Sequence, residues 1–334
     1  MKLTKGLVTI TAVLGASVFG LTACEQKKSE PVVAAPAEVS SPSADAACGV
    51  APSGELVAER IVTANSTRTE PGLYEGPVWV NGALYFSDFI FTQGFSSRIQ
   101  RLNSDGSLTV VVENSGSNGL AADSQGALIA ATHKYKSLSR YNIATGERTS
   151  VAEKFNGNVF NSPNDLTIAK DGTIYFTDPD YQREAAPGGQ EKMGVYRVGT
   201  DGTVILVDDT LIKPNGIALS LDESVLYVNG GTESGPVIRS YPIVNGIPQA
   251  GKNIVTGIGG PDGMTLDCKG NIYLTEHVEK RVRVFTPAGE NIATINVDAN
   301  ITNAAFGGAQ GKTLYLTGAG SLWKIELGLT GNPY

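Results

Sequence analysis

The chain has 334 residues, of which 41% are hydrophobic and 18% are charged, and its net charge is −7. This apolar content is enough for a sizeable core, which excludes general disorder. With 26 basic against 33 acidic residues, the chain lacks the electrostatic footprint of a nucleic-acid-binding protein, so we expect no nucleic-acid partner. Two His and three Cys are too few for a His-rich metal cluster or an all-cysteine zinc site. The 40 glycines, about 12% of the chain against a usual value of about 7%, indicate many turns and short strands.

Residues 1–23 have the composition of a secretory signal peptide, in which a positively charged start precedes an apolar run. The run ends in LTAC, which resembles the bacterial lipobox, where the cysteine is lipidated and becomes the mature N-terminus. We therefore expect a lipid anchor at Cys24, which would be the protein's sole attachment to a membrane. The alternative is an ordinary signal peptide followed by a chance cysteine. Glu25 is not the Asp that retains enterobacterial lipoproteins at the inner membrane, which favours the outer membrane of a bacterial cell envelope.

Residues 24–53 are rich in Ala, Pro, Ser, Glu and Val and show neither a helical nor a strand period. This composition predicts a disordered tether between the anchor and a globular part that begins at residue 54. If Cys24 is lipidated, Cys48 and Cys268 are the remaining thiols in an oxidising compartment. They either form a disulfide or stay unpaired, and the sequence does not distinguish these outcomes.

One pattern recurs six times between residue 54 and the end of the chain. A polar residue opens an apolar strand, and a second strand, such as ALYFSD, TIYFTD or NIYLTE, ends 13 or 14 residues after that opener. A third strand follows in every unit and a fourth in five of them, with turns such as NSDG, TDG and PAG between them. Successive openers are 41 to 51 residues apart, and they are Glu75, Asn118, Asn164, Asn215, Asp262 and Asn303.

A period of about 40 to 50 residues with four strands per unit predicts a six-bladed β-propeller. The sixth unit ends after its third strand, whereas Glu55–Thr63 reads as a strand that precedes the first unit and has no other partner. We expect this N-terminal strand to join the last blade and close the ring, which removes an open sheet edge. The predicted fold is therefore all-β, with one propeller domain over residues 54–334.

The first strand of each propeller blade lines the central channel, so the six openers should meet at one mouth of it. The residues that end the second strands return to the same face, and they are Asp88, His133, Asp178, Asn229, Glu276 and His277. Convergent carboxylate and amide oxygens suit a hard divalent cation, which would also relieve the repulsion between acidic openers. The alternative for any single opener is that its side chain serves only a turn.

Four motifs resemble the family that groups senescence marker protein, gluconolactonase and luciferin-regenerating enzyme. They are EGPVW with LYFSD, SPND with YFTDP, PNGIA with LYV, and PDGM with NIYLTE, in the family's order. The resemblance spans about residues 54–328 and implies a six-bladed propeller with one divalent cation at the channel mouth. It implies that the cation ligands are Glu75, Asn164, Asn215 and Asp262. Ca²⁺ is favoured, with Zn²⁺, Mn²⁺ and Mg²⁺ as the alternatives.

The chain departs from the family at one position and resembles one of its branches at others. Animal members that act on aldonolactones carry an Arg two residues before the Asn-Asp pair, where this chain has Ser162. The SPND form, the NGL motif at Asn118 and the His at position 133 resemble bacterial gluconolactonases, so we expect Asn118 and His133 to bind substrate. For His133 the alternative is a hydrogen-bonded rim histidine, and His277 is expected to be structural. Residues 181–194 form either a lid or a plain surface loop.

The resemblance implies hydrolysis of sugar lactones, with Asp262 as a general base or, less favoured, as a nucleophile. We expect a cell-envelope lactonase that acts on a small-molecule lactone or ester, in which water activated by Asp262 attacks a metal-polarised carbonyl. One alternative is a hydrolase of other esters or of phosphotriesters. Another is a non-catalytic propeller that binds a sugar or a partner protein. Neither a Gly-x-Ser-x-Gly elbow nor a phosphate-binding or dinucleotide motif occurs in the sequence.

Overall fold

The computed structural model describes residues 48–63 and 72–332. The chain divides into two units, residues 1–41 and 42–334, and all described residues belong to the second. The expected signal peptide, the lipidation site Cys24 and most of the tether lie outside the described residues and stay predictions. Among the residues that are described, no helix combines the length and the apolar character needed to cross a membrane.

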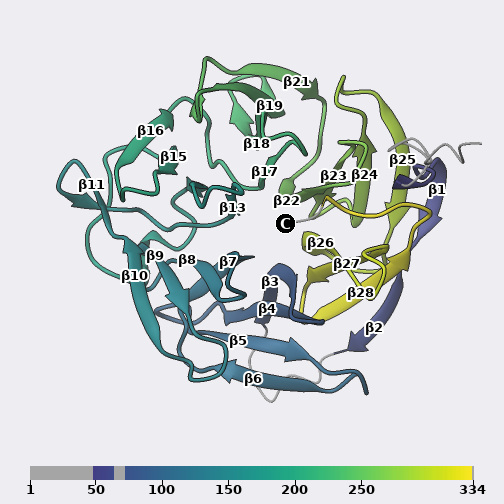
Figure 1. Ribbon diagram of the computed structural model, residues 1–334, viewed down its shortest axis with the longest axis horizontal. Coiled ribbons are helices and arrows are strands. Elements are labelled where there is room, and N and C mark those ends of the chain that lie inside the picture. Colours follow the sequence, from purple (N-terminus) through teal and green to yellow (C-terminus); the bar gives the residue numbers. More distant parts are fainter. Residues whose placement is uncertain (1–47, 64–71, 333–334) are drawn as a thin grey trace, which may run out of the picture. The chain divides into compact units, whose positions relative to one another are not determined.

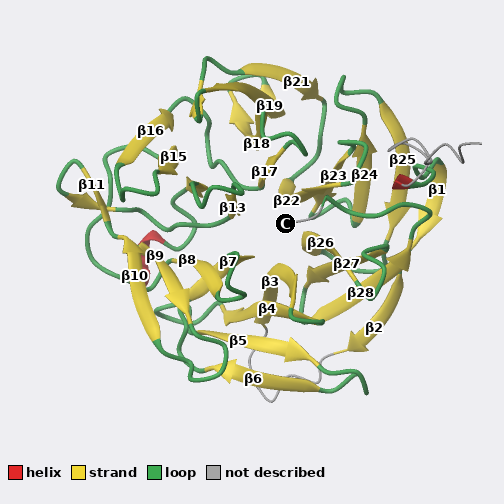
Figure 2. Ribbon diagram, viewed as in Figure 1, coloured by secondary structure: helices red, strands yellow, loops and turns green. Residues whose placement is uncertain are grey.

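The second unit is a six-bladed β-propeller, which confirms the predicted fold. Figures 1 and 2 show the blades following one another in chain order around a central channel, with the first strand of each blade innermost. Each blade is an antiparallel sheet. The first three blades are built from β3 (Gly72–Val80), β4 (Ala83–Ile90), β5 (Ser97–Leu102) and β6 (Leu108–Val112); β7 (Ser117–Ala122), β8 (Leu128–Thr132), β9 (Ser137–Tyr141) and β10 (Arg148–Ala152); and β13 (Leu166–Ile168), β14 (Ile174–Asp178), β15 (Gly194–Val198) and β16 (Val204–Asp208).

The other three blades repeat this order, with small additions at the rim. They contain β17 (Ile217–Leu219), β18 (Val225–Thr232), β19 (Gly235–Val244) and β21 (Lys252–Thr256); β22 (Pro261–Leu266), β23 (Ile272–Glu276), β24 (Arg281–Phe285) and β25 (Asn291–Asn296); and β26 (Ile301–Gly307), β27 (Thr313–Gly318) and β28 (Ser321–Glu326). The additions are the hairpin of β11 (Lys154–Phe155) and β12 (Asn158–Val159), the strand β20 (Ile247–Pro248) beside β19, and the single-turn 3₁₀ helix η1 (Arg183–Ala185).

The N-terminal segment closes the ring, but not as one strand. β2 (Glu59–Thr63) pairs antiparallel with β28 and supplies the fourth strand of blade 6, as expected. β1 (Gly54–Val57), in contrast, pairs in parallel with β25 and adds a fifth strand to blade 5. The prediction of a continuous strand over Glu55–Thr63 was therefore wrong at its first half. The chain crosses between blades at Ala58, which is buried and bonds through its N–H to the Asn296 carbonyl.

The hydrophobic core is divided among the junctions between blades. Six clusters of buried side chains occur, and each joins two neighbouring blades. The cluster between blades 5 and 6, for example, packs Tyr273 and Val284 against Leu316 and Trp323. Because the alternating strand residues face one neighbour or the other, every blade depends on the two beside it. The closed ring therefore holds the mouth residues of different blades at set positions.

A recurring bulge places the openers at the channel mouth. In blades 1, 2, 5 and 6 the pairing of the first two strands shifts register at the opener, as between Glu75 and Val78 or between Pro261 and Met264. In blade 3 the two residues Asn164 and Asp165 both bond to Thr177 through their backbone, the two-against-one arrangement of a bulge. A bulge re-aims the side chain that it carries, which turns the opener toward the axis.

Glycines after the openers allow neighbouring blades to approach one another. A Cβ on Gly119 would lie 2.6 Å from the Asn164 carbonyl oxygen, and one on Gly216 would lie 2.5 Å from the Asp262 carbonyl oxygen. The amides of the same two glycines donate to those carbonyls, at 2.7 and 3.0 Å. Any side chain at these positions would therefore push the next opener away and break its backbone bond to the preceding blade.

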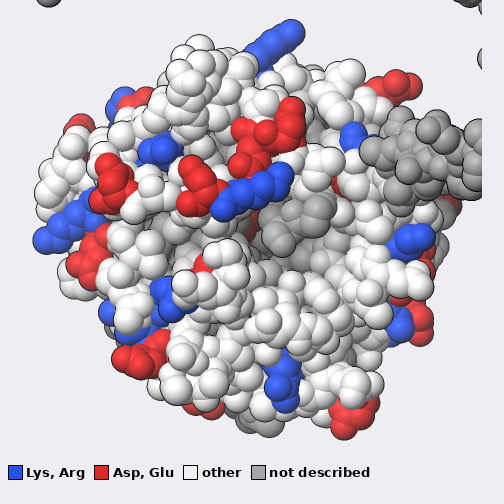
Figure 3. Space-filling model, viewed as in Figure 1, with Lys and Arg blue, Asp and Glu red and all other residues white. Residues whose placement is uncertain are grey.

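The first and the last described segments of the chain meet on the opposite face from the openers. A disulfide joins Cys48 to Cys268, which lies in the turn between β22 and β23, with the Cα atoms 5.8 Å apart. Val50 donates through its N–H to the Gly328 carbonyl at 3.2 Å, so Cys48–Val50 packs on the propeller and does not belong to the predicted tether. Figure 3 shows basic and acidic side chains interspersed around the face in view.

Replacing both cysteines of this disulfide by Ser should lower the free energy of unfolding by about 2 to 4 kcal/mol, because the bond closes a loop of 220 residues in the unfolded chain. Urea unfolding of Cys48→Ser/Cys268→Ser beside the parent protein measures the difference. A reductant should destabilise the parent by a similar amount and leave the double variant unchanged. Equal stability of parent and variant in oxidising buffer would contradict the prediction.

Candidate functional site

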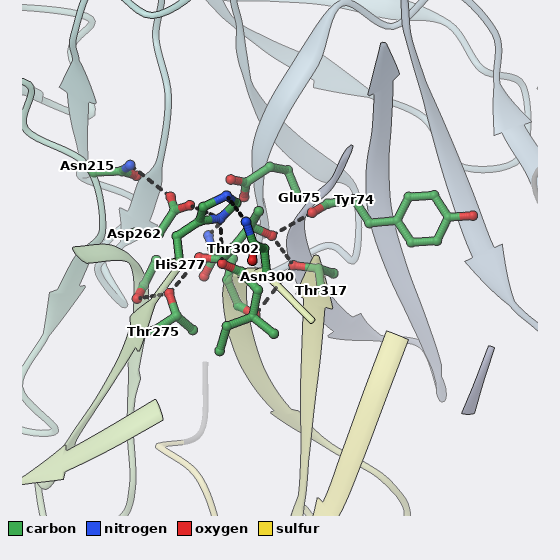
Figure 4. Close-up of polar contacts among 12 residues, drawn as sticks. Tyr74, Glu75, Asn215, Asp262, Thr275, His277, Asn300, Thr302 and Thr317 are labelled. Atoms are coloured by element: carbon green, nitrogen blue, oxygen red, sulfur yellow. Dashed lines mark hydrogen bonds and ion pairs between the residues drawn. The ribbon is translucent and has the colours of Figure 1, made fainter. Parts of the chain in front are cut away.

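Three carboxyl groups, two of them buried and one partly buried, gather at the channel mouth. Glu75 on β3 and Asp262 on β22 come from blades 1 and 5, and their carboxylates face each other in Figure 4. Each of the two interacts electrostatically with Asp165, which directly precedes β13. Glu75 and Asp165 are only 4% and 6% exposed. The structure thus brings together the two acidic openers and adds a third carboxylate that the sequence analysis had not assigned to the site.

Burial raises the pKa of all three groups, because an ionised carboxylate loses its hydration in the channel. Burial raises the pKa of Asp262 to about 8; the charge of Asp165 acts in the same direction, and a hydrogen bond from Asn215 opposes both. Burial raises the pKa of Asp165 to about 7, against a hydrogen bond from Asn303. For Glu75, burial and then the charges of Asp262 and Asp165 raise the pKa well above its usual value. This cluster therefore keeps protons near neutral pH unless a positive charge compensates it.

Amide side chains of the openers surround the carboxylates. Asn215 donates through Nδ2 to Asp262 Oδ1 at 2.8 Å. Asn303 donates through Nδ2 to Asp165 Oδ2 at 3.1 Å and, more weakly, to Glu75 Oε2 at 3.5 Å. Asn164 opens the first strand of blade 3 at the same mouth and is buried, and its side chain has no hydrogen-bond partner among the described residues. Its amide is thus available to a ligand.

His277 lies beside Asp262. Its Nδ1 is 2.8 Å from the Ile301 carbonyl oxygen and 3.6 Å from Asp262 Oδ2, and its Nε2 is 3.2 Å from Asn300 Nδ2. A carbonyl oxygen only accepts, so Nδ1 carries the proton, and Nε2 then accepts from the Asn300 amide. His277 was expected to be structural, and that expectation did not include its place beside the Asp262 carboxylate. The sequence signal was its place directly after the NIYLTE strand.

The two predicted substrate-binding residues differ in their surroundings. Asn118 on β7 is 1% exposed, and within the described part of the chain its Oδ1 has no hydrogen-bond partner. His133 is fully buried, with Nε2 2.8 Å from the Phe95 carbonyl oxygen and its ring edge-on to Phe89. Burial lowers the pKa of His133 to about 4, so the ring is neutral and donates through Nε2. Its contacts are with these aromatic residues and not with the carboxylates, so a role in substrate binding remains a prediction.

The acidic residues that end the second strands stabilise loops and do not join the site. Asp88 accepts hydrogen bonds from Arg98 and Gln100 of its own blade, at 2.7 and 2.8 Å. Asp178 accepts the backbone N–H groups of residues 161 and 162. Glu276 is held between Arg281 and Arg283. Successive residues of a strand face opposite sides, so these acidic side chains point along their own blade. The residues one position earlier face the next blade and hydrogen-bond to it, and they are Ser87, Thr177 and Thr275.

The loop over residues 181–194 is anchored at several points. The Gln182 N–H donates to Ser162 Oγ at 3.2 Å, and the buried Lys136 ammonium donates to the Arg183 carbonyl at 2.7 Å. Farther along, Gln190 donates through Nε2 to backbone carbonyls of the β11–β12 hairpin. The loop therefore forms a fixed wall beside the channel mouth.

Tyr181 at the start of this loop reaches the site, and the sequence analysis missed it. The Asn215 side chain and the charges of Asp262 and Glu75 all act on the phenol. Burial first and the Asp262 charge second raise its pKa to about 12, so the phenol is protonated and can donate at neutral pH. The signal in the sequence was its position three residues after Asp178, which ends a second strand at the mouth.

The donor set fits a hard divalent cation. Among the described residues, no group of three or more His, Cys, Asp or Glu side chains is arranged to hold a metal, so a cation site must use amide oxygens as well. Glu75 and Asp262 supply two facing carboxylates, and Asn164 and Asn118, which open the first strands of blades 3 and 2, supply amide groups without a hydrogen-bond partner among the described residues. Such oxygen donors are those that Ca²⁺ and Mg²⁺ prefer.

Two cavities lie along the channel below the mouth. One of about 60 Å³ is lined by Asp165 and Asn303 and by Thr167 and Thr265. Both threonine hydroxyls are buried without a partner among the described residues, so this space suits ordered water. Another cavity of about 740 Å³ opens at the far end, among turn residues such as Asn81, and is separate from the carboxylates.

The family model, the curated relatives and the solved structures described below all point to lactonases and gluconolactonases. The family model described as SMP-30/Gluconolactonase/LRE-like region matches residues 73–320. A gluconolactonase from Zymomonas mobilis is 28% identical over 282 residues, which cover 75% of this chain and 78% of that protein. A pentonolactonase from Haloferax volcanii is 27% identical over 78% of this chain and 93% of its own. The solved gluconolactonase of Xanthomonas campestris superimposes with a TM-score of 0.70 at 28% identity, covering 84% of this chain and all of that one.

The carboxylate cluster should make the metal-free protein less stable as the pH rises from 5 to 8. Asp262 keeps its proton up to a pKa of about 8 in the folded chain but ionises with a pKa of about 4 when unfolded. Between these two values the unfolded chain binds fewer protons, so stability falls as the pH rises and levels off above about 8. Thermal melting of chelator-treated protein across this range should show a falling Tm. The decline should be smaller in Asp262→Asn and in protein saturated with Ca²⁺. A flat profile for the metal-free parent would contradict the raised pKa.

Proposed function

Because the chain belongs to the SMP-30/gluconolactonase/LRE-like family, we propose that it is a divalent-metal-dependent lactonase that opens sugar lactones such as gluconolactone. The observation that carries this proposal is the pair of facing carboxylates of Glu75 and Asp262. They come from blades 1 and 5, amides of other blades bond to them, and burial raises the pKa of both. A protein that used this mouth only as a structural channel would not need two acidic side chains facing each other across it.

In the proposed site each residue has a distinct task. A bound divalent cation supplies Lewis-acid polarisation of the lactone carbonyl. Glu75 is the proposed anionic anchor, and Asn164 and Asn215 are proposed to add neutral oxygens, which leave the site net positive. Ionised Asp262 accepts a proton from the attacking water, and the ring C–O bond then breaks to give a hydroxy acid. The bond from Asn215 Nδ2 and the neighbouring His277 orient the Asp262 carboxylate.

Substrate recognition is assigned to residues around this centre. Asn118 offers an unpartnered amide oxygen, which can accept a hydrogen bond from a substrate hydroxyl. His133 is the second proposed contact, through its unpartnered Nδ1. The names of the relatives support lactones as the substrate class, among them gluconolactone and pentonolactone.

We further propose that the protein works in the bacterial cell envelope, attached through a lipid at Cys24. Support comes from where the chain enters the propeller. Cys48 is bonded to the turn between β22 and β23, at the opposite end of β22 from Asp262. A tether that reaches the propeller there would leave the channel mouth accessible to small molecules.

Changing Asp262 to Asn should lower kcat/KM for gluconolactone by about 100-fold or more, because the proposed general base is lost. Removing metal with a chelator should abolish the parent's activity, and Ca²⁺, Mn²⁺ or Zn²⁺ should restore it. A pH-drop assay on purified protein that begins near residue 48 measures both effects. The matched control is Asp201→Asn in an exposed turn of blade 3, which should keep parental activity.

The same assay separates the competing functions. Parental activity in Asp262→Asn would remove this residue from the mechanism. Turnover of aryl esters or phosphotriesters without turnover of lactones would replace the proposed substrate class. Tight metal binding by calorimetry with no turnover on the whole panel would identify a ligand-binding propeller.

A further inference from the structure

Tyr181 combines a solvent-exposed ring with a hydroxyl on which groups of the channel mouth act. The side chain is 39% exposed and its ring contacts Lys213, two residues before the opener Asn215, while Asn215 and Asp262 act on its hydroxyl. An aromatic ring with one wet side and a polar tip is suited to a ligand that has both C–H faces and hydroxyl groups. Neither the sequence motifs nor the proposed mechanism uses it.

The side chain is held in place from two directions. The Lys213 ammonium lies 4.7 Å from the centre of the Tyr181 ring, a cation–π contact, and its Nζ is 3.0 Å from Asp180 Oδ1. Lys213 has a positive φ of 49°, a backbone conformation that is uncommon for a residue with a side chain. On the other side, the Gln182 N–H is bonded to Ser162 Oγ. Residues on both sides of Tyr181 are thus anchored to different segments, which fixes the ring at the mouth.

We propose that Tyr181 is a substrate-binding residue, whose ring forms a wall of the pocket and whose hydroxyl hydrogen-bonds a hydroxyl group of a polyhydroxylated lactone. The proposal rests on the proposed lactonase function and narrows it to a hydroxylated substrate class. Two features favour such a partner. The groups that act on its hydroxyl, Asn215, Asp262 and Glu75, are polar, and a substrate hydroxyl can accept from the phenol while donating to Asp262.

The decisive variant is Tyr181→Phe, which removes the hydroxyl and keeps the ring. Losing one hydrogen bond should raise KM for gluconolactone about 2- to 12-fold with little change in kcat. KM for δ-valerolactone, which has no hydroxyl group, should stay at the parental value. The matched control is Tyr135→Phe, a tyrosine on the neighbouring blade's loop whose hydroxyl bonds to the Asn114 carbonyl; it should leave both KM values unchanged.

A binding measurement makes the test independent of turnover. Calorimetry with gluconolactam, a ring analogue that resists hydrolysis, should show a Kd for Tyr181→Phe weakened by the same factor as KM. Lys213→Met, which removes the cation over the ring, should weaken binding in the same direction while the protein remains folded by circular dichroism. Because Kd is measured directly, a parent enzyme that hydrolyses no lactone would overturn the proposed function and still test the role of Tyr181.

Two results would overturn the inference. One is an unchanged Kd and KM in Tyr181→Phe. The other is an equal loss for gluconolactone and δ-valerolactone, which would assign Tyr181 to the ester group or to the structure of the loop and not to a substrate hydroxyl.

Discussion

The close approach of neighbouring blades at the channel mouth is the constraint on which the rest of the molecule depends. Where an opener lies against the preceding blade, the contact is between backbones, as at Gly119 with Asn164 and at Gly216 with Asp262. Hydroxyls such as those of Thr177 and Thr275 add bonds to the following blade. Because backbone bonds of this kind have little freedom, residues about 45 positions apart in the chain are held in one ring.

That ring forces like charges together. Glu75, Asp165 and Asp262 come from three blades. The first two are buried and Asp262 is partly buried, and the loss of hydration makes the charge of each unfavourable. The six hydrophobic clusters between blades hold the ring closed despite this repulsion. A stable scaffold of this kind can hold polar groups in an unfavourable arrangement. A cation at the mouth is the simplest means of relieving the repulsion between these carboxylates.

Individual residues show how far the sequence could lead. The spacing of Glu75, Asn215 and Asp262 was sufficient to place them at one mouth, since propeller geometry converts a repeat into a ring. The same reasoning put Asp88 and Glu276 beside them, although they pair with Arg98 and Arg283 on their own blades. Whether a side chain faces the channel or its own blade depends on the alternation of residues along the strand. A shift of one residue at the end of the strand turns the side chain to the other side.

Other residues carried no periodic signal. Asp165 stands where four of the other five blades have Gly and blade 6 has Ala304, so the repeat identified its position without assigning its role. Tyr181 lies in a loop whose path is set by Ser162, Lys136 and Lys213, which come from different parts of the fold. The split of the N-terminal segment between blades 5 and 6 likewise depends on which sheet edges are free once the ring has formed.

The sequence by itself determined the number of blades, the order of their strands and the residues that open them, because these follow from local periodicity and turn chemistry. Only the tertiary structure decided which carboxylates face one another, which are neutralised within their blades, and that Tyr181 and His277 reach Asp262. Those outcomes depend on side-chain direction and on contacts between distant segments, which no local pattern encodes.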